Sequence, residues 1–273
     1  MIPRRETWVA ALFMAAIGAG TAVADDDEVT GAAKRFLPYA KATAVKYQLK
    51  NENDEPLKME KAGESLLRWT NPLTVSKNHG ELFLWTDRGR PTAVLSMYEY
   101  STDTGNVHEH HEWISLALGP FRATGPREWS PITAGIELRH VPDAPTPADT
   151  PIRRLGQIRE LAVEFTAEKT SRQGIKRPIR LMVQPLFRYD TGDPDVIDGA
   201  LYTFVEGTDP DVFLCLEARL FEGKPAWYYG LTRVVRLRLA VSHKGREIWV
   251  GELLDPSQTH NQKYATYSVF DIR

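Results

Sequence analysis

The sequence predicts an α+β fold in which antiparallel strands form most of the structure and one main amphipathic helix packs against a sheet. The stretch 151–172 has the spacing of apolar residues that is typical of a helix. Short segments rich in β-branched and aromatic residues occur both before and after it. The apolar side of the helix has to be covered, and a sheet built from these strands would cover it. A two-sheet β-sandwich with a peripheral helix is the alternative.

The predicted helix has clear signals at both ends. Thr150 can cap its N-terminus, Pro151 suits the first helical position, and Gly174 would end it. Apolar residues recur every three or four positions and form one stripe, which comprises Ile152, Leu155, Ile158, Leu161, Ala162 and Phe165. We therefore expect this stripe to be buried from Leu155 onward, and Arg154 and Glu164 to be exposed.

The first 24 residues have the pattern of a cleaved signal peptide. Arg4 and Arg5 supply positive charge, an apolar run follows, and Ala22-Val23-Ala24 matches the small-residue cleavage pattern. The apolar run contains glycines and ends at this cleavage pattern, which favours a signal peptide over a membrane anchor. No other long apolar run occurs, so we expect a soluble, secreted or periplasmic protein without a transmembrane segment after processing.

Composition narrows the class of partner and the redox chemistry. Without residues 1–24 the chain has 32 basic and 35 acidic residues, a formal charge of −3. Proteins that bind nucleic acids usually carry a concentrated positive charge, so this balance argues against a nucleic-acid partner. Cys215 is the only cysteine, which rules out an intramolecular disulfide. Its apolar neighbours predict a small buried side chain in a strand rather than a nucleophile.

The first half of the chain is predicted to be rich in short strands. Residues 25–34 are acidic and small, as in a mobile lead-in. Residues 34–44 predict a short helix whose inner side carries Phe36, Leu37, Tyr39 and Ala40. Strands are predicted at 44–49, 66–69, 81–86, 93–100 and 111–118. A polar turn at 87–91 joins two of these strands into a hairpin.

A proline-rich segment divides the chain into two halves. Four prolines in residues 142–151 predict a stiff, extended connector. The N-terminal half, 25–141, is β-rich. The C-terminal half, 152–273, begins with the helix and continues as a β-meander, although both halves could also form one continuous domain. Its predicted strands are 179–183, 186–189, 200–205, 212–220, 226–231, 234–242 and 247–250.

The sequences of the two halves resemble each other at a constant offset of 119 residues. The identical pairs are Gly80/Gly199, Leu82/Leu201, Pro91/Pro210 and Leu95/Leu214, and the similar ones include Phe83/Tyr202, Trp85/Phe204 and Met97/Leu216. An internal duplication would produce this pattern. Strands also select similar residue types, so two unrelated apolar hairpins would resemble each other as well. In either case, each half contains a hairpin with neighbouring strands.

A histidine-rich segment, 107–113, is the strongest local candidate for a metal-binding or catalytic site. Alternate side chains of a strand share a face, which gives one set of His108, His110 and Glu112 and another of Glu109, His111 and Trp113. Two imidazoles and a carboxylate can ligate zinc or iron, so the first set is a candidate metal site. The His-x-His pattern resembles metal-dependent cupins, but the expected glutamate spacing and glycine frame are missing. A solvated loop is the alternative.

A second candidate is an acidic segment with four carboxylates, Asp190, Asp193, Asp195 and Asp198. Calcium prefers such oxygen ligands, but Pro194 breaks the order of ligands found in an EF-hand. The alternative is a solvated turn. Beyond zinc or iron in the first segment and calcium here, the sequence predicts no cofactor.

Several segments together resemble an uncharacterised family of exported bacterial proteins. They are Leu67-Arg-Trp-Thr-Asn-Pro72, Phe83-Leu-Trp85, Gln184-Pro-Leu186, Asp198-Gly-Ala-Leu-Tyr202 and Glu206-Gly-Thr-Asp-Pro210. The resemblance would cover most of the processed chain and implies export. It implies no activity and no functional residues, because none is known for that family.

The sequence predicts a non-catalytic binding or structural module of the cell envelope or extracellular space, with a protein or a polysaccharide as partner. It lacks a nucleophile elbow, a phosphate-binding loop, a dinucleotide fingerprint and the HExxH and CxxC motifs. The alternative is a metal-dependent enzyme built on His108, His110 and Glu112. An exposed row of tryptophans would favour binding, and three ligands that converge in a pocket would favour the enzyme.

Overall fold

The structure is a computed structural model that describes residues 24–71, 78–101, 107–255 and 263–270. Strands make up 53% of it and helices 13%, and every strand pairing is antiparallel. The predicted α+β fold dominated by antiparallel strands is therefore confirmed. Among the described residues, no helix has the length and apolar character needed to cross a membrane.

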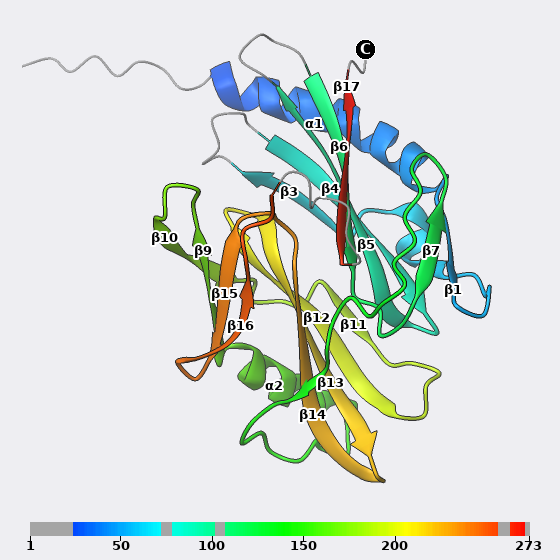
Figure 1. Cartoon of the computed structure of the whole chain (residues 1–273), viewed down its shortest axis with the longest axis vertical. Helices are drawn as coiled ribbons and strands as arrows, with labels where there is room; N and C mark the ends of the chain where they lie inside the picture. The colour runs from blue at the N-terminus through cyan, green and yellow to red at the C-terminus, as the bar shows by residue number, and fades with distance from the viewer. Residues whose placement is uncertain (1–23, 72–77, 102–106, 256–262, 271–273) are drawn as a thin grey trace, which may run out of the picture.

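The first sheet is six-stranded, with the order β17-β6-β5-β4-β2, and β3 also pairs with β4 (Figure 1). A two-stranded ribbon of β1 and β7 lies beside it. The bounds of these strands are β1 Gln48–Asn51, β2 Lys58–Met59, β3 Leu67–Asn71, β4 Asn78–Asp87, β5 Arg90–Ser101, β6 Val107–Ser115, β7 Phe121–Thr124 and β17 Tyr264–Phe270. A 3₁₀ turn, Glu60–Gly63, follows β2.

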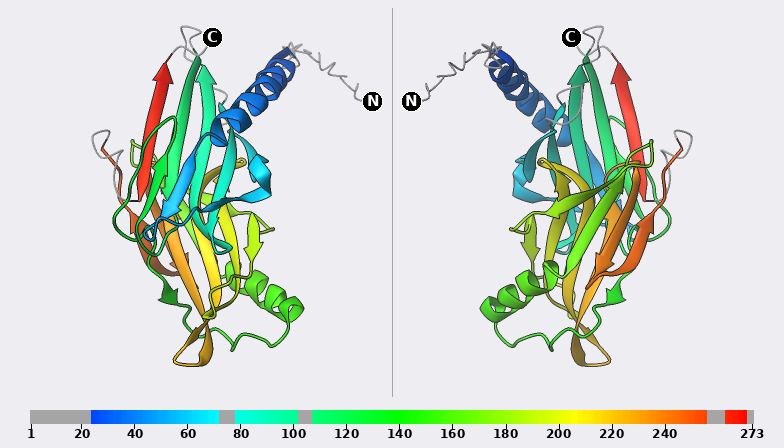
Figure 2. Two further views of the ribbon diagram at one scale, coloured as in Figure 1. Left: turned by 90° about the vertical axis from the view of Figure 1, so that its right-hand side faces the viewer. Right: turned by 90° about the vertical axis from the view of Figure 1, so that its left-hand side faces the viewer.

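The second sheet is nine-stranded, with the order β16-β15-β9-β10-β12-β13-β14-β8, and β11 also pairs with β12. Its strands are β8 Arg139–His140, β9 Phe165–Thr170, β10 Lys176–Leu181, β11 Phe187–Tyr189, β12 Val196–Glu206, β13 Asp209–Phe221, β14 Lys224–Arg233, β15 Arg238–His243 and β16 Arg246–Gly251. The long strands of both sheets run close to the long axis of the molecule (Figure 2).

The sheets face each other, and each carries one helix on its outer face. Alternation along β4 shows this, because Leu82 and Leu84 belong to a core shared by both sheets, whereas Phe83 and Trp85 face α1, Ala24–Ala44. The second sheet alternates in the same way between the shared core and α2, Pro151–Ala162. The structure thus has four layers, in the order helix, sheet, sheet, helix. The alternative of a two-sheet sandwich agrees with the facing sheets. The helices are not peripheral, however, because each contributes side chains to a hydrophobic core.

The main helix is half as long as predicted. Thr150 caps α2, since its hydroxyl accepts a hydrogen bond from the backbone N–H of Arg153 at 3.4 Å, as expected. The helix ends at Ala162, however, and Phe165 begins strand β9. The prediction of a helix to residue 172 was wrong, because the alternation of Phe165 and Ala167 is that of a strand with one buried face. Gly174 lies in the turn after β9.

Arg154 was expected to be exposed and is buried. Its side chain crosses to β12, where Nε donates to Asp198 at 2.9 Å, and Nη1 donates to the carbonyls of Ala148 and Asp149. An ion pair to a distant residue overrides the helical pattern. Within the predicted stripe, Ile158, Leu161 and Phe165 are buried as expected, whereas Leu155 is only half-buried.

The N-terminal helix is longer than predicted. It starts at Ala24 rather than near residue 34, so the backbone of 25–34 is helical and not a mobile lead-in. Phe36 and Ala40 face the first sheet as expected, but Tyr39 is 40% exposed. Residues 1–23 of the proposed signal segment, 1–24, lie outside the described residues.

The two halves repeat one arrangement of strands. The bridge of Lys50 to Pro56 continues β1 into β2, and the bridge of Ala123 to Trp129 extends β7. With these bridges, the neighbours in the first half run from Trp129 through β7, β1, β2, β4, β5 and β6 to β17. Position by position, this order corresponds to β16-β15-β9-β10-β12-β13-β14-β8 in the second half. The off-path strands β3 and β11 pair with β4 and β12 in the same way.

Local irregularities also coincide at the offset of 119. A register shift lies between Trp85 and Thr86 in one half and between Phe204 and Val205 in the other. A Cβ atom on Gly80 would lie 2.5 Å from the ring of Trp69, and one on Gly199 would lie 2.3 Å from the ring of Tyr189. Equivalent glycines thus accommodate equivalent aromatic rings. These coincidences favour duplication over chance similarity of two hairpins.

Each half completes the sheet of the other. The last strand of the C-terminal half, β17, pairs with β6, and β8 of the N-terminal half pairs with β14. The hairpin tips also make reciprocal contacts. The N–H of Gly192 donates to the carbonyl of Arg88 at 3.1 Å, and Thr70 and Thr208 exchange three hydrogen bonds. The connector at 142–151 therefore joins two parts that share strands rather than two separable domains.

Candidate functional site

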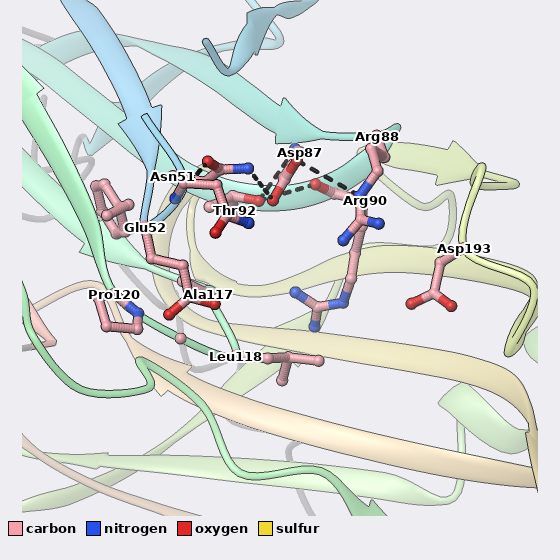
Figure 3. Close-up of a pocket in the computed structure, with 13 residues that line it drawn as sticks. Asn51, Glu52, Asp87, Arg88, Arg90, Thr92, Ala117, Leu118, Pro120 and Asp193 are labelled. Atoms are coloured by element: carbon pink, nitrogen blue, oxygen red, sulfur yellow. Dashed lines mark hydrogen bonds and ion pairs between the residues drawn. The ribbon is translucent and has the colours of Figure 1, made fainter. Parts of the chain in front are cut away.

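A pocket of about 230 Å³ opens where the β4–β5 hairpin tip meets the other half of the chain (Figure 3). Its walls come from the end of β1 and the following turn, from the hairpin, from the β6–β7 loop, and from the loop after β11. The lining residues are Asn51, Glu52, Asn53, Asp87, Arg88, Arg90, Thr92, Ala117, Leu118, Gly119, Pro120, Phe121 and Asp193. Both halves therefore contribute polar groups to one concave surface.

Arg90 is the buried cation of this pocket, with a relative exposure of 8%. Its Nε donates to Glu217 at 2.9 Å, and its Nη1 donates to the carbonyls of Pro91 and Leu116 at 3.0 and 2.8 Å. Its Nη2 has no hydrogen-bond partner among the described residues. A buried guanidinium nitrogen without a partner is costly, so a ligand oxygen that reached Nη2 after a small shift of the pocket wall would relieve that cost.

Glu217 fixes the position of Arg90. Burial would raise the pKa of Glu217, but the charge of Arg90 and the hydrogen bonds from Arg219 and Tyr189 lower it overall, so the carboxylate is ionised. The Tyr189 hydroxyl donates to it at 2.8 Å, and Nη1 of Arg219 donates at 2.8 Å. Nη2 of Arg219 also lies 3.7 Å from the Asp193 carboxylate at the rim. The network therefore links the floor of the pocket to its edge.

The opposite rim is held by hydrogen bonds of the hairpin and of β1. Nδ2 of Asn51 donates to the Asp87 carboxylate at 3.3 Å, and the N–H of Asp87 donates to the Thr92 hydroxyl at 3.1 Å. Figure 3 shows Arg90 reaching between these residues and Leu118. The result is a pocket that offers both donors and acceptors, a combination suited to a ligand with hydroxyl groups.

The predicted set of His108, His110 and Glu112 lies on β6 of the first sheet. His110 and Glu112 point toward the second sheet, opposite to Glu109 and His111, so the predicted alternation holds. Within the described parts of the chain, no group of three or more His, Cys, Asp or Glu side chains is arranged to hold a metal ion. The metal site stays a prediction.

His110 and Glu112 are engaged by tyrosines. His110 stacks on Tyr98 with ring centroids 5.0 Å apart, and its Nδ1 is 3.2 Å from the Ser268 hydroxyl. Burial and the nearby Arg236 lower the pKa of His110 to about 4, so the imidazole is neutral at pH 7. The Tyr264 hydroxyl donates a short hydrogen bond to Glu112. Burial raises the pKa of Glu112 to about 7.

A lysine and several carboxylates form a second buried polar cluster near Glu112. Nζ of Lys169 lies 2.9 Å from the Asp211 carboxylate and 2.8 Å from that of Glu206. Asp209 accepts a hydrogen bond from Asn71 at 2.9 Å. Burial and the charge of Asp211 raise the pKa of Asp209. At the offset of 119, Asp209 corresponds to Arg90, so this cluster occupies the place in the second half that the pocket occupies in the first.

A tyrosine and a histidine are buried on the opposite face of β6, beneath α1. The Tyr47 hydroxyl lies 2.6 Å from Nδ1 of His111, and Nε2 of His111 forms a short hydrogen bond with Glu109. All three residues are less than 5% exposed. A substrate could not reach them without movement of α1, so we assign them to the structure of the core.

The acidic segment proposed for calcium does not bring its carboxylates together. Asp198 is buried and accepts from both Arg154 and Arg188. Asp193 instead faces the pocket rim and caps a turn by accepting from the N–H of Asp195 at 3.0 Å. These two carboxylates serve different contacts.

Cys215 and the tryptophans belong mainly to the cores. Cys215 is fully buried, and burial raises the pKa of its thiol to about 12, which confirms the prediction of a small buried side chain. Of the tryptophans after residue 24, Trp249 is half-buried. The other five are buried, namely Trp69, Trp85, Trp113, Trp129 and Trp227. They do not form the exposed row that would have indicated an aromatic binding surface.

Comparison with protein-family models, with curated proteins and with solved structures gives no match. The pocket around Arg90 is therefore interpreted from its own geometry. Sequence reasoning identified residues 87–91 only as a turn, and it did not connect them with Glu217 or Asp193. The one available signal was a charged residue, Arg90, placed directly before Pro91 and a strongly apolar strand.

Proposed function

We propose that the protein is an exported, non-catalytic binding module of the cell envelope or extracellular space, and that the pocket around Arg90 binds a sugar-sized unit of a polysaccharide. The observation that carries the proposal is Arg90, which lines the pocket and whose buried Nη2 has no hydrogen-bond partner among the described residues. A small shift of the pocket wall would expose this donor, which Glu217 holds in place, to an oxygen atom of a ligand.

The size of the pocket favours a small ligand unit. Sites for drug-sized molecules have volumes of roughly 300–1,000 Å³. A pocket of about 230 Å³ is smaller than these, and it is open to solvent. One ring of a longer polymer would fit this shape, with the rest of the polymer outside.

The chemistry of the lining favours hydroxyl groups over a free anion or a free cation. Glu52, Asp87 and Asp193 supply acceptors, whereas Arg88 and Arg90 supply donors. Three carboxylates would repel an anion such as phosphate, and the two guanidiniums would repel a simple cation. A hydroxyl group is both donor and acceptor, so it can bridge neighbouring groups of this mixed set.

The test is a titration of the purified protein with glucose, N-acetylglucosamine, galacturonic acid and their short oligomers, followed by amide chemical shifts. We expect a subset of these sugars to shift the amides of Asn53 and Gly119. Leu118→Trp should fill the pocket and abolish the shifts, because Leu118 lines it and is 43% exposed. Leu253→Trp is the matched control, since Leu253 is 51% exposed and does not line the pocket.

Two results would contradict the proposal. One is that no sugar shifts the pocket amides, or that Leu118→Trp binds as the unaltered protein does. The other is that a bound oligosaccharide is cleaved, which would replace the non-catalytic assignment by an enzymatic one.

A further inference from the structure

A second surface of the molecule has the character of an interaction site. The β9–β10 hairpin projects at one side of the second sheet (Figure 1). Residues 172–180 contain four basic residues and no acidic one, the basic residues being Arg172, Lys176, Arg177 and Arg180. All four are exposed. The hairpin therefore concentrates positive charge on a protein whose overall formal charge is −2.

The positive charges near the tip form no ion pair among the described residues. Among the described residues, Arg172, Lys176 and Arg177 have no carboxylate within ion-pair distance. The charge of Arg177 helps to lower the pKa of Glu206, and Glu168 lies opposite Pro178 across the strands. The tip also presents an apolar side chain, Ile175, which is 54% exposed. Charge and an exposed aliphatic group are thus combined at one tip.

The equivalent hairpin of the other half shows that the fold does not need these residues. The N–H of Asn51 donates to the carbonyl of Glu55, as that of Ser171 does to Ile175, each at 2.9 Å. A positive φ follows in both turns, at Asp54 and at Gly174. The two turns therefore have the same geometry at an offset of 120.

The composition of these two turns is opposite. At the positions of Arg172 and Ile175 in the basic turn, the other turn has Glu52 and Glu55. The same backbone turn is thus built with acidic residues on one side of the molecule and with basic and apolar residues on the other. Turn formation therefore does not explain the basic residues, whereas a contact with an anionic surface outside the chain would.

We propose that the basic β9–β10 hairpin docks the protein on an anionic lipid surface, with Ile175 entering the headgroup layer. Each Lys or Arg near an anionic membrane strengthens binding by about 1 kcal/mol, which is roughly fivefold. Basic side chains around an exposed aliphatic residue are the combination found in segments that lie at membrane surfaces. The surface is separate from the pocket around Arg90, so this inference does not depend on the proposed sugar binding.

The test is co-sedimentation of the protein with vesicles of phosphatidylcholine and phosphatidylglycerol in equal parts, and with vesicles of phosphatidylcholine alone. We expect binding only to the anionic vesicles, and weaker binding as salt is raised. The combined variant Arg172→Gln/Lys176→Gln/Arg177→Gln should bind about a hundredfold more weakly, from three fivefold losses. All three side chains are exposed, and thermal melting verifies that the variant is folded.

The matched control changes the same number of charges elsewhere, in Lys46→Gln/Lys61→Gln/Lys224→Gln, and should retain most of the binding. Ile175→Ser should weaken vesicle binding severalfold. The proposal is overturned if the protein does not bind anionic vesicles, or if both triple variants lose binding equally. It is also overturned in favour of an acidic polymer if dextran sulfate binds the hairpin as tightly as the vesicles do and Ile175→Ser has no effect.

Discussion

Replacing Glu112 by Gln should remove one part of the pH dependence of stability, alongside the parts that come from Asp209 and Asp211. Glu112 is 8% exposed, accepts hydrogen bonds from Tyr264 and Tyr98, and lies near Arg236 and Asp211. Burial raises its pKa from 4.5 to about 7, although the two tyrosines and Arg236 partly oppose this. Gln keeps the shape and an acceptor oxygen for Tyr264, but it does not titrate.

The direction of the effect follows from which state binds the proton. Between pH 4.5 and 7 the folded protein keeps Glu112 protonated, whereas the unfolded chain ionises it, so stability falls as pH rises through this window. The shift from 4.5 to about 7 predicts a loss of about 2.5 kcal/mol between pH 5 and pH 8. For a domain of this size, the loss corresponds to a decrease in Tm of roughly 5–10 °C.

The assay is urea unfolding of the unaltered protein and of Glu112→Gln at several values between pH 5 and pH 8. The variant should be close to the unaltered protein at pH 5 and about 2.5 kcal/mol more stable at pH 8. Glu247→Gln is the control, since Glu247 is exposed. Parallel pH profiles for Glu112→Gln and the unaltered protein would refute the reasoning, because they would mean that Glu112 is ionised in the folded state.

Four other predictions concern packing, charge, metal content and export. Gly199→Ala should destabilise the protein by about 3 kcal/mol or more in urea unfolding, because its Cβ would lie 2.3 Å from the Tyr189 ring, whereas Gly192→Ala, with open space around it, should be nearly neutral. Arg154→Ala should cost about 1.5–3 kcal/mol, because the buried Asp198 carboxylate loses one of its two guanidinium partners and keeps Arg188, and exposed Arg153→Ala should cost less than about 1. Elemental analysis should find well under one equivalent of zinc, iron or copper, and stoichiometric metal would instead favour the metal-dependent enzyme. Intact-mass analysis of protein from its native host should show the loss of about the first 24 residues, and their retention would contradict the cleaved signal peptide.

The fold class could be predicted because strand and helix patterns are local. The alternation along 107–113 correctly separated the two faces of β6, and the offset of 119 identified Gly80 and Gly199 as equivalent. The end of α2 was missed because Phe165 fits both a helical stripe and a strand, and only pairing with β15 decides between them. Local patterns do not contain that pairing.

The candidate site could not be predicted because its parts are far apart in the sequence. Arg90 and Glu217 are joined across the two halves, and Asp193 comes from a loop that reaches the hairpin tip through Gly192. The burial of Arg154 was missed for the same reason, since its partner lies 44 residues away. Long-range ion pairs change the burial of charged residues in ways that periodicity does not reveal.

The exchange of terminal strands sets the order in which this chain can fold. Ile114 of β6 pairs with Tyr264 of β17, which lies 150 positions later in the chain, so the first sheet gains this strand only after the whole second sheet has been synthesised. Pairings of such long sequence separation form slowly. Until β17 arrives, the backbone of β6 has an open hydrogen-bonding edge, and such edges pair readily with other chains. A ribosome that stops before codon 264 therefore releases a chain prone to aggregation, however well the rest of its sequence is suited to folding.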